Sequence, residues 1–117
     1  MMKHMEHMSQ TGAQKFENGA AVSWEYDMQG AHLNVAPISI SGRYPHSGFT
    51  RNLESDAIIH IISGAGILGL SDGSSVLLAK NDQIHLSIGD SYYFEGNLDI
   101  IYAASPPWTP EQSEHSN

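Results

Sequence analysis

Histidine, tyrosine and carboxylate side chains are the groups in this sequence that could exchange protons with a substrate or bind a metal ion. The chain has seven histidines, five tyrosines and 13 acidic residues, but no cysteine. The lack of cysteine excludes disulfide bonds, thiolate catalysis and zinc sites with sulfur ligands. The chemistry to expect is therefore acid–base catalysis, hydrogen bonding, or metal binding through nitrogen and oxygen.

The spacing of the histidines predicts where they point. His60 lies three residues after Ala57 in an apolar run, so strand alternation places the two side chains on opposite faces. His85 lies between two apolar residues and should also point outward. We expect both histidines at the surface or at a subunit interface. His46 lies in a predicted loop and is the one histidine that could be recruited to an interior site.

Other polar residues are open to two interpretations each. Glu54 and Asp56 could act as an acid–base pair, although both lie at the edge of a predicted loop, where solvated carboxylates are common. Arg43 could bind an anionic substrate, but bracing of its own loop is the favoured interpretation. Tyr92 and Tyr93 must point to opposite faces of a strand. If Tyr92 faces inward, its phenol bonds either to the protein or to a ligand.

The composition predicts a single β-rich domain. The chain has 117 residues, 11 glycines and only 15% charged residues. Its net charge is −8, and its five Lys and Arg residues are scattered. Nucleic acids and anionic membranes are therefore unfavourable partners. No apolar run approaches the roughly 20 residues that span a bilayer, and the N-terminus lacks the apolar core of a signal peptide, so we expect a cytoplasmic protein.

Short strands separated by turns are predicted from residue 20 onward. Residues 21–26 alternate, with Val22, Trp24 and Tyr26 on one face. Residues 31–41 alternate as well, and Pro37 predicts a sheet edge or a bulge there. Further strands are expected at residues 57–63, 65–71, 76–79, 83–87, 92–95 and 98–104. Asp72-Gly73 predicts a hairpin, and the number of strands favours a sandwich, jelly roll or barrel.

Both ends of the chain are expected to be tails. We place a flexible tail at residues 1–19, the barrel domain at residues 20–108 and a second tail at residues 109–117. The N-terminal residues His4, Met5, His7 and Met8 could form a soft copper site, but a disordered terminus is the favoured interpretation. Thr109-Pro110-Glu111 could begin one short helical turn. Trp108 should pack the end of the last strand, and stacking on a sugar is the alternative.

Two stretches of the sequence resemble the two motifs of the cupin family. Gly42 and Gly64 match glycines of the first motif, and Asp82 and Gly89 match positions of the second. A closer resemblance is to small single-domain cupins with a GRYP loop, a YYxEGN strand and a PxWxPEQ terminus. This chain has GRYP at residues 42–45, YYFEGN at residues 92–97 and PWTPEQ at residues 107–112. The resemblance implies an all-β cupin jelly-roll barrel of two antiparallel sheets with an interior pocket.

The resemblance also locates the positions that bind metal in many cupins. Thr50 and Asn52 stand at the positions of the paired histidines, Ala57 at that of the glutamate, and Tyr92 at that of the third histidine. None of these is a strong ligand for a first-row metal, and alanine cannot bind one at all. We therefore predict no cofactor, with a divalent metal on unconventional ligands as the alternative.

The function implied by these features is binding of a small polar molecule, such as a sugar or an organic acid, inside the barrel. The residues expected to bind it are Thr50, Asn52, Tyr92, Phe94, His46 and Arg43. The alternatives are a cupin enzyme of isomerase or dioxygenase type, and a structural dimer without a ligand. The enzyme would use an unconventional metal site or metal-free acid–base chemistry through His46 or Tyr92. A homodimer is expected because outward apolar residues in the segment 57–62 need cover.

Overall fold

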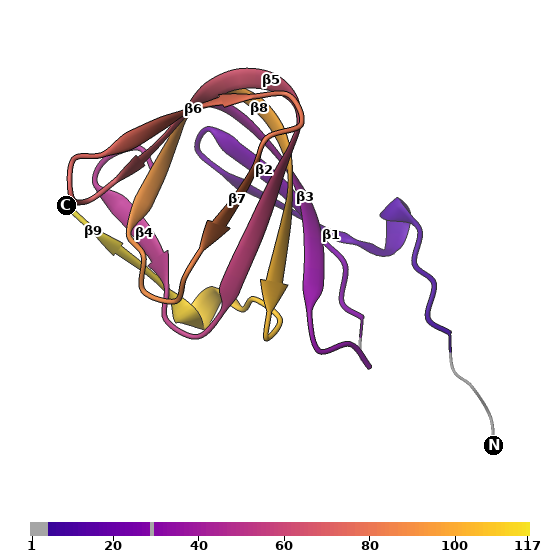
Figure 1. Ribbon diagram of the computed structural model, residues 1–117. Helices are drawn as coiled ribbons and strands as arrows, with labels where there is room; N and C mark the ends of the chain where they lie inside the picture. Colours follow the sequence, from indigo (N-terminus) through magenta and orange to yellow (C-terminus); the bar gives the residue numbers. More distant parts are fainter. Residues whose placement is uncertain (1–4, 29) are drawn as a thin grey trace.

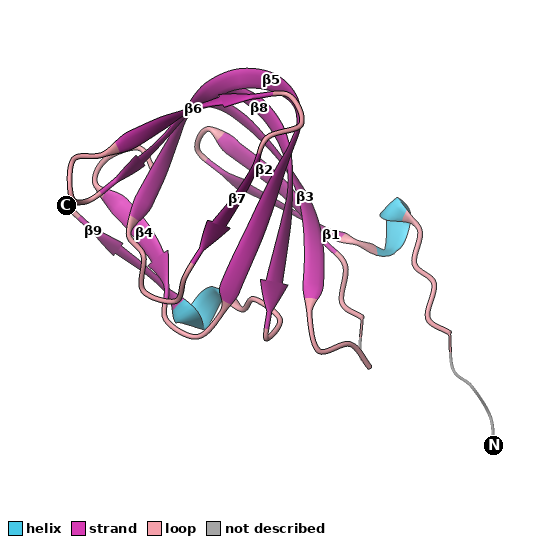
Figure 2. Ribbon diagram, in the orientation of Figure 1, coloured by secondary structure: helices cyan, strands magenta, loops and turns pink. Residues whose placement is uncertain are grey.

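Strands make up most of the chain in the computed structural model, which describes residues 5–28 and 30–117 (Figure 2). In chain order the elements are η1 (Gln10–Gly12), β1 (Gln14–Asn18), β2 (Ala21–Glu25), β3 (Asn34–Tyr44), β4 (Phe49–Asn52), β5 (Asp56–Leu70), β6 (Ser75–Ala79), β7 (Gln83–Leu86), β8 (Tyr92–Ser105), η2 (Pro110–Gln112) and β9 (Ser113–Ser116). The two helices are single 3-10 turns, and no described helix has the length and apolar character needed to cross a membrane.

The strands pair antiparallel and curl into a barrel (Figure 1). The centre of the sheet is β8, which pairs with β3 along one side and with β5 along the other. Strands β2 and β1 extend the sheet beyond β3, while β4 and β9 extend it from the start of β8. Strands β6 and β7 pair with the two halves of β5. This arrangement confirms the predicted all-β antiparallel barrel.

Strand alternation determines which side chains fill the barrel. Alternate residues of β8 face inward and are 1–8% exposed, namely Tyr92, Phe94, Leu98, Ile100, Tyr102 and Ala104. On β5, Ile59 and Ile61 are fully buried, whereas Ile58 and Ile62 on the other face are 40% and 46% exposed. The homodimer expected from this outer apolar face remains a prediction.

The histidines on this face point outward, as expected. His60 Nδ1 lies 3.2 Å from Gln83 Oε1, and His85 Nε2 lies 3.5 Å from the Asp56 carboxylate. Both contacts lie on exposed surface, away from the barrel interior.

Strand β5 is longer than predicted because it bends without breaking its pairing. The sequence predicts two strands separated by a glycine corner, but β5 pairs with β8 throughout, with one irregularity between Ile61 and Ser63. Gly64 has φ +94°, and a Cβ there would lie 2.0 Å from the Asn97 carbonyl oxygen. Glycine therefore allows the bend and the close approach of the two backbones.

The two predicted tails each contain a strand. Residues 14–18 pair with β2 as a hairpin, and residues 113–116 pair with β4. The short polar segments that form these strands lack the apolar alternation that marks a strand in sequence. The helical turn predicted at Thr109-Pro110-Glu111 is present as η2. His4, which the copper hypothesis requires, lies outside the described residues.

A buried glutamine fixes the C-terminal strand to the barrel. Gln112 is 2% exposed, and its Oε1 accepts hydrogen bonds from the backbone N–H groups of Glu54 and Ser55 at 3.1 and 2.9 Å. Its Nε2 donates to Ser55 Oγ at 2.8 Å. Gln112 of the PWTPEQ segment thus provides hydrogen-bond partners for polar groups of the loop between β4 and β5, and it positions β9 beside β4.

We predict that Gly64→Ala destabilises the protein far more than Gly73→Ala. Both glycines have positive φ, which costs a side chain about 1–2 kcal/mol. Only at Gly64 does the new Cβ also collide with backbone, which should raise the total loss to about 3 kcal/mol or more. Urea unfolding of the two variants measures the difference. Equal losses would show that the β5 bend does not depend on close backbone approach.

Candidate functional site

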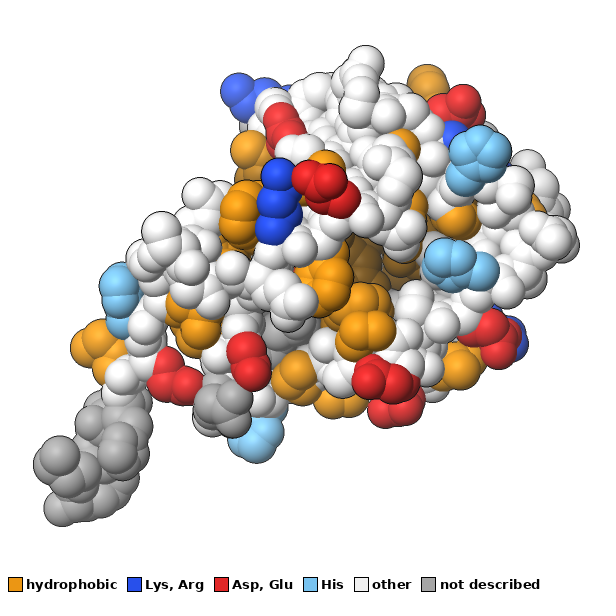
Figure 3. Space-filling view, turned by 180° about the vertical axis from the view of Figure 1, so that it is seen from behind, with side chains coloured by type: hydrophobic (Ala, Val, Ile, Leu, Met, Phe, Trp, Pro, Cys, Tyr) orange, Lys and Arg blue, Asp and Glu red, His pale blue; other side chains and the backbone are white. Residues whose placement is uncertain are grey.

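The barrel encloses a cavity of about 600 Å³, within the size range of small-molecule sites. Its walls come from β1, β2, β3, β4, β8, η2 and β9, and Figure 3 shows a hollow with hydrophobic side chains inside it on the side opposite to the view of Figure 1. The apolar part of the wall consists of Phe16, Ala21, Ala36, Ile38, Ile40, Phe94, Ile100, Trp108 and Pro110. The remaining lining residues are polar or carry hydroxyl groups, so the cavity can hold a molecule with both apolar and polar parts.

Four of the residues predicted to bind a ligand lie together on this wall. Thr50, Asn52, Tyr92 and Phe94 all line the cavity, and Thr50 is the cross-strand partner of Tyr92. Each of the four is at most 6% exposed. Tyr92 and Phe94 pack edge to face at 5.6 Å between ring centroids. The inward direction predicted for Tyr92 is therefore correct.

The other two predicted residues lie outside the cavity lining. Arg43 donates from its two terminal nitrogens to the carbonyl oxygens of Pro45 and Gly48, at 2.7 and 3.0 Å. Its guanidinium also lies 4.0 Å from the ring centroid of Tyr93, on the outer face of β8. Arg43 thus braces its own loop, the favoured interpretation of the sequence. His46 is exposed in the same loop.

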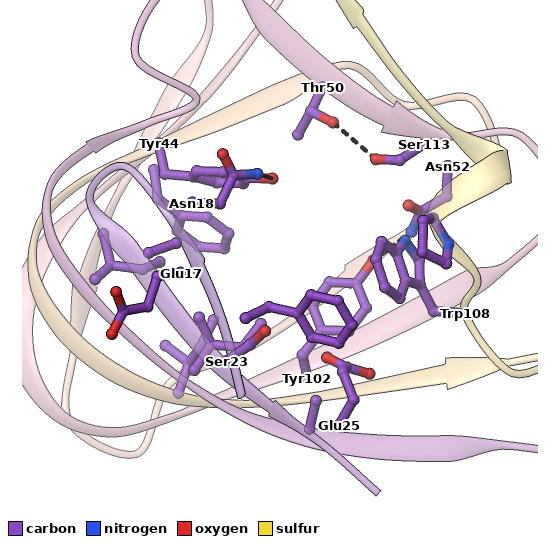
Figure 4. A pocket seen from close by; sticks show the side chains of 18 of the residues that line it. Glu17, Asn18, Ser23, Glu25, Tyr44, Thr50, Asn52, Tyr102, Trp108 and Ser113 are labelled. Atoms are coloured by element: carbon purple, nitrogen blue, oxygen red, sulfur yellow. Dashed lines mark hydrogen bonds between the residues drawn. The ribbon is translucent and has the colours of Figure 1, made fainter. Parts of the chain in front are cut away.

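Two phenols and one amide form a cluster in the cavity wall, and Figure 4 shows two of its members, Tyr102 and Asn52. The Asn52 side-chain NH₂ donates to the Tyr102 hydroxyl oxygen, and the Tyr92 hydroxyl is hydrogen-bonded to Tyr102 as well. This bond raises the pKa of Tyr92 and lowers that of Tyr102. Each hydroxyl can donate one proton and accept through its oxygen, so the two phenols and the amide form a connected polar network.

Burial keeps both phenols protonated. It is the largest cause raising the pKa of Tyr92 well above its ordinary value of 10, with the nearby Tyr102 adding to it. Burial also raises the pKa of Tyr102, although the hydrogen bonds from Asn52 and Tyr92 oppose the increase. At neutral pH both groups therefore act as neutral hydroxyls.

A carboxyl group lies near the phenols on the same wall. Glu25 extends from β2 into the cavity, and its proximity adds to the increase in the pKa of Tyr102. Burial raises the pKa of Glu25 above its ordinary value of 4.5, while a hydrogen bond with Ser23 opposes this. Asn34 Nδ2 lies 3.5 Å from the Glu25 carboxylate, and Asn34 Oδ1 accepts the backbone N–H of Trp108 at 3.0 Å. Asn34 thus lies between the Trp108 backbone and the Glu25 carboxylate.

Glu25 could not be predicted as a site residue because the faces of β2 are reversed relative to the usual pattern. The apolar face of an alternating strand normally faces the core. Here Val22 and Trp24 lie on the outer side, where Lys15 Nζ is 5.7 Å from the Trp24 ring centroid. Ser23 and Glu25 face the cavity instead. The alternation of β2 does predict a polar face. Such a face can line a cavity as well as face solvent.

Residues from both edges of the sheet line another part of the cavity wall. Asn18 of β1 donates from Nδ2 to the Tyr44 hydroxyl at 3.3 Å, and the ring of His115 on β9 meets Tyr44 edge to face at 6.4 Å. Thr50 Oγ1 and Ser113 Oγ are 3.4 Å apart (Figure 4). Asn18, Ser113 and His115 could not be predicted as site residues because β1 and β9 lie in the segments expected to be tails.

Comparison with solved structures shows that the barrel has the cupin fold. Pac13, described as a unique nucleoside dehydratase, superimposes with a TM-score of 0.86 at 15% identity, over 97% of this chain and 92% of that chain. The polyketide cyclase RemF from Streptomyces resistomycificus gives a TM-score of 0.74 at 13% identity, over 97% and 87%. Ectoine synthase from P. lautus gives 0.71 at 12% identity, over 88% and 80%.

Comparison of amino-acid sequences assigns this chain to no family. Neither the known protein-family profiles nor the curated protein sequences match this chain. The identities to the solved structures are low, so they establish the fold alone. Membership of the GRYP-loop group of small cupins remains a prediction.

The residues at the cupin metal positions do not fit a metal ion. Thr50, Asn52 and Tyr92 line the cavity but present two hydroxyls and an amide, which already bond to protein groups. Ala57 is 1% exposed and offers no ligand atom. Among residues 5–28 and 30–117, no three His, Asp or Glu side chains cluster closely enough to hold an ion. These side chains therefore do not support a chemical step through a metal ion.

We predict that Glu25→Gln stabilises the protein at neutral pH and that this gain shrinks in acid. The folded-state pKa of Glu25 is raised, so the native protein binds more protons than the unfolded chain above the ordinary pKa of 4.5. The wild-type protein therefore loses stability as the pH rises from 4.5 through the raised pKa of Glu25. Glutamine does not titrate, so the Glu25→Gln variant does not lose stability in this way. Urea unfolding at about pH 4 and about pH 7 measures both variants.

The matched control for this prediction is Glu95→Gln. The Glu95→Gln substitution removes the same charge from the exposed outer face of β8. A gain from Glu25→Gln that does not grow between the two pH values, or that Glu95→Gln reproduces, would contradict an interior position for Glu25.

Proposed function

We propose that this protein binds a small polar organic molecule in the barrel cavity and exchanges protons with it through Tyr102 and Glu25. The observation that carries the proposal is the polar cluster in the cavity wall, in which the Tyr102 hydroxyl accepts a hydrogen bond from Asn52 and is hydrogen-bonded to Tyr92. A carboxyl of raised pKa on the same wall supplies a second group for proton transfer.

The two groups suit an elimination or an isomerisation. In an elimination of water, Tyr102 would donate its proton to the leaving hydroxyl while ionised Glu25 removes a proton from the neighbouring carbon. The substrate loses a hydrogen and a hydroxyl as water. The hydrogen bonds that Tyr102 accepts from Asn52 and Tyr92 would stabilise its phenolate. Return of the proton from Glu25 to Tyr102 through solvent would restore the site.

The structural neighbours support the plausibility of such chemistry on this barrel. Pac13 is described as a nucleoside dehydratase, and Streptomyces Pac13 variants have been solved with uridine. RemF is a cyclase and ectoine synthase a synthase, so these names all denote transformations of small organic molecules. The assignment of Glu25 and Tyr102 rests on the geometry of this chain.

Binding without turnover is the second candidate. Every buried side-chain nitrogen and oxygen among the described residues has a hydrogen-bond partner within the protein. The wall is therefore complete without a reaction partner, as a cavity that only binds requires. In this case Asn52, Tyr92 and Thr50 would provide selectivity through their positions alone.

Filling the cavity tests the proposal. Ala36 of β3 lines the cavity at 3% exposure, whereas Ala103 lies on the outer face of the neighbouring strand β8. A thermal-shift panel of small polar molecules should give ligands that stabilise the wild type by about 2.7 kcal/mol at 100 times Kd. We expect Ala36→Leu to weaken their binding by about tenfold or more, because the added side chain occupies ligand space. Ala103→Leu should bind them like the wild type.

Two further variants separate catalysis from binding for any ligand so found. Tyr102→Phe keeps the ring and removes the proton, and Glu25→Gln removes the base. An enzyme should lose turnover in both while its affinity changes by less than about tenfold. Absence of turnover in the wild type would favour the second candidate. Absence of any ligand, or ligands that bind Ala36→Leu normally, would overturn the assignment of the cavity.

A further inference from the structure

The cavity lining contains no cationic side chain among the residues that the structure describes. The arginines and lysines near the barrel already have partners: Lys15 pairs at 2.9 Å with Glu17, which lines the cavity, Arg51 pairs with Glu114, and Arg43 bonds to loop carbonyls. Lys80 is exposed between β6 and β7 and does not line the cavity. A negatively charged ligand would therefore meet no compensating charge inside.

The groups that do line the cavity attract positive charge. Glu25 is a partly buried carboxyl whose neighbours are an amide and hydroxyls. The aromatic residues of the wall are Phe16, Tyr44, Tyr92, Phe94, Tyr102 and Trp108. The faces of such rings carry partial negative charge and bind organic cations, most strongly where water is excluded. The net charge of −8 adds a long-range field of the same sign.

We infer that the ligand of this cavity is an organic cation, a small molecule that carries an ammonium group on an apolar body. The inference rests on the binding part of the proposed function and assigns Glu25 the role of counter-ion in place of base. It narrows the candidate ligands, since it disfavours the organic acids. The ammonium group would lie against the Glu25 carboxylate, and the apolar body would pack on Trp108, Phe94 and the apolar wall.

Linkage between the ligand and Glu25 gives the inference a distinctive signature. A cation beside the carboxylate favours its ionised form, so binding and protonation of Glu25 oppose each other. Affinity for a cation should therefore increase as the pH rises through the raised pKa of Glu25. The other charged or titratable lining groups are Glu17, His115 and the tyrosines. Glu17 is paired with Lys15, and His115 is an exposed residue beside Tyr44.

Three probes of similar size and different charge test the inference, namely benzylamine, benzyl alcohol and benzoate. Binding is followed by NMR shifts of cavity residues in the full chain. We expect benzylamine to bind about tenfold more tightly than benzyl alcohol, and benzoate to bind most weakly. In Glu25→Gln the preference for benzylamine should fall by about fivefold or more, and its rise with pH should disappear. Glu95→Gln, which removes an outward charge from β8, should retain both.

The outcomes distinguish this inference from the proposed function. Equal binding of benzyl alcohol, or tighter binding of benzoate, would overturn the cation assignment and leave small-molecule binding intact. The same conclusion would follow if none of the probes binds while a neutral ligand from the thermal-shift panel binds and is blocked by Ala36→Leu. If no ligand of any charge binds in the cavity, the proposed function itself fails.

Discussion

The pairing of β8 on both of its edges is the constraint on which the rest of the structure depends. Because β3 and β5 bond to it along almost its whole length, β8 cannot slide or turn without breaking two ladders. Its inward residues are therefore fixed in direction. Leu98 and Ile100 form part of the core, and Tyr92 and Tyr102 carry the hydroxyls of the cavity wall. The site is rigid because it is built on the most constrained strand.

The same constraint explains how polar groups are tolerated inside the barrel. A buried hydroxyl or amide without a partner costs about 1–3 kcal/mol. Here Asn52, Tyr102 and Tyr92 satisfy one another, and Gln112 satisfies the loop after β4. Glu25 differs from these groups, since burial raises its pKa although a hydrogen bond with Ser23 opposes the increase. A group held at such a cost in a cavity is a reasonable candidate for function.

Much of the fold could be predicted from the sequence because strand alternation is a strong signal. It correctly gave the opposite directions of Tyr92 and Tyr93 and the outward direction of His60 and His85. The hairpin at Asp72-Gly73 joins β5 to β6 as expected. The division of β5 and β8 into shorter strands was wrong, because glycines that read as breaks allow bends within continuous pairing.

Half of the candidate site could not be predicted, and the reasons are physical. Strand β1 is held by backbone pairing with β2, and β9 by backbone pairing with β4 and by Gln112. These interactions leave no apolar pattern in the sequence. Glu25 lies on the polar face of β2, and sequence alone does not reveal whether such a face meets solvent or a cavity. Tyr102 reads as one more apolar residue in the last strand until its hydrogen bonds to Asn52 and Tyr92 are seen.

The most direct test of this account is an NMR titration of the Glu25 side-chain carboxyl in the free protein. If Glu25 belongs to a partly buried wall without a compensating cation, its pKa will lie above the ordinary value of 4.5. A pKa at or below that value would mean that the carboxylate is solvated or paired, and would contradict its place in the proposed site.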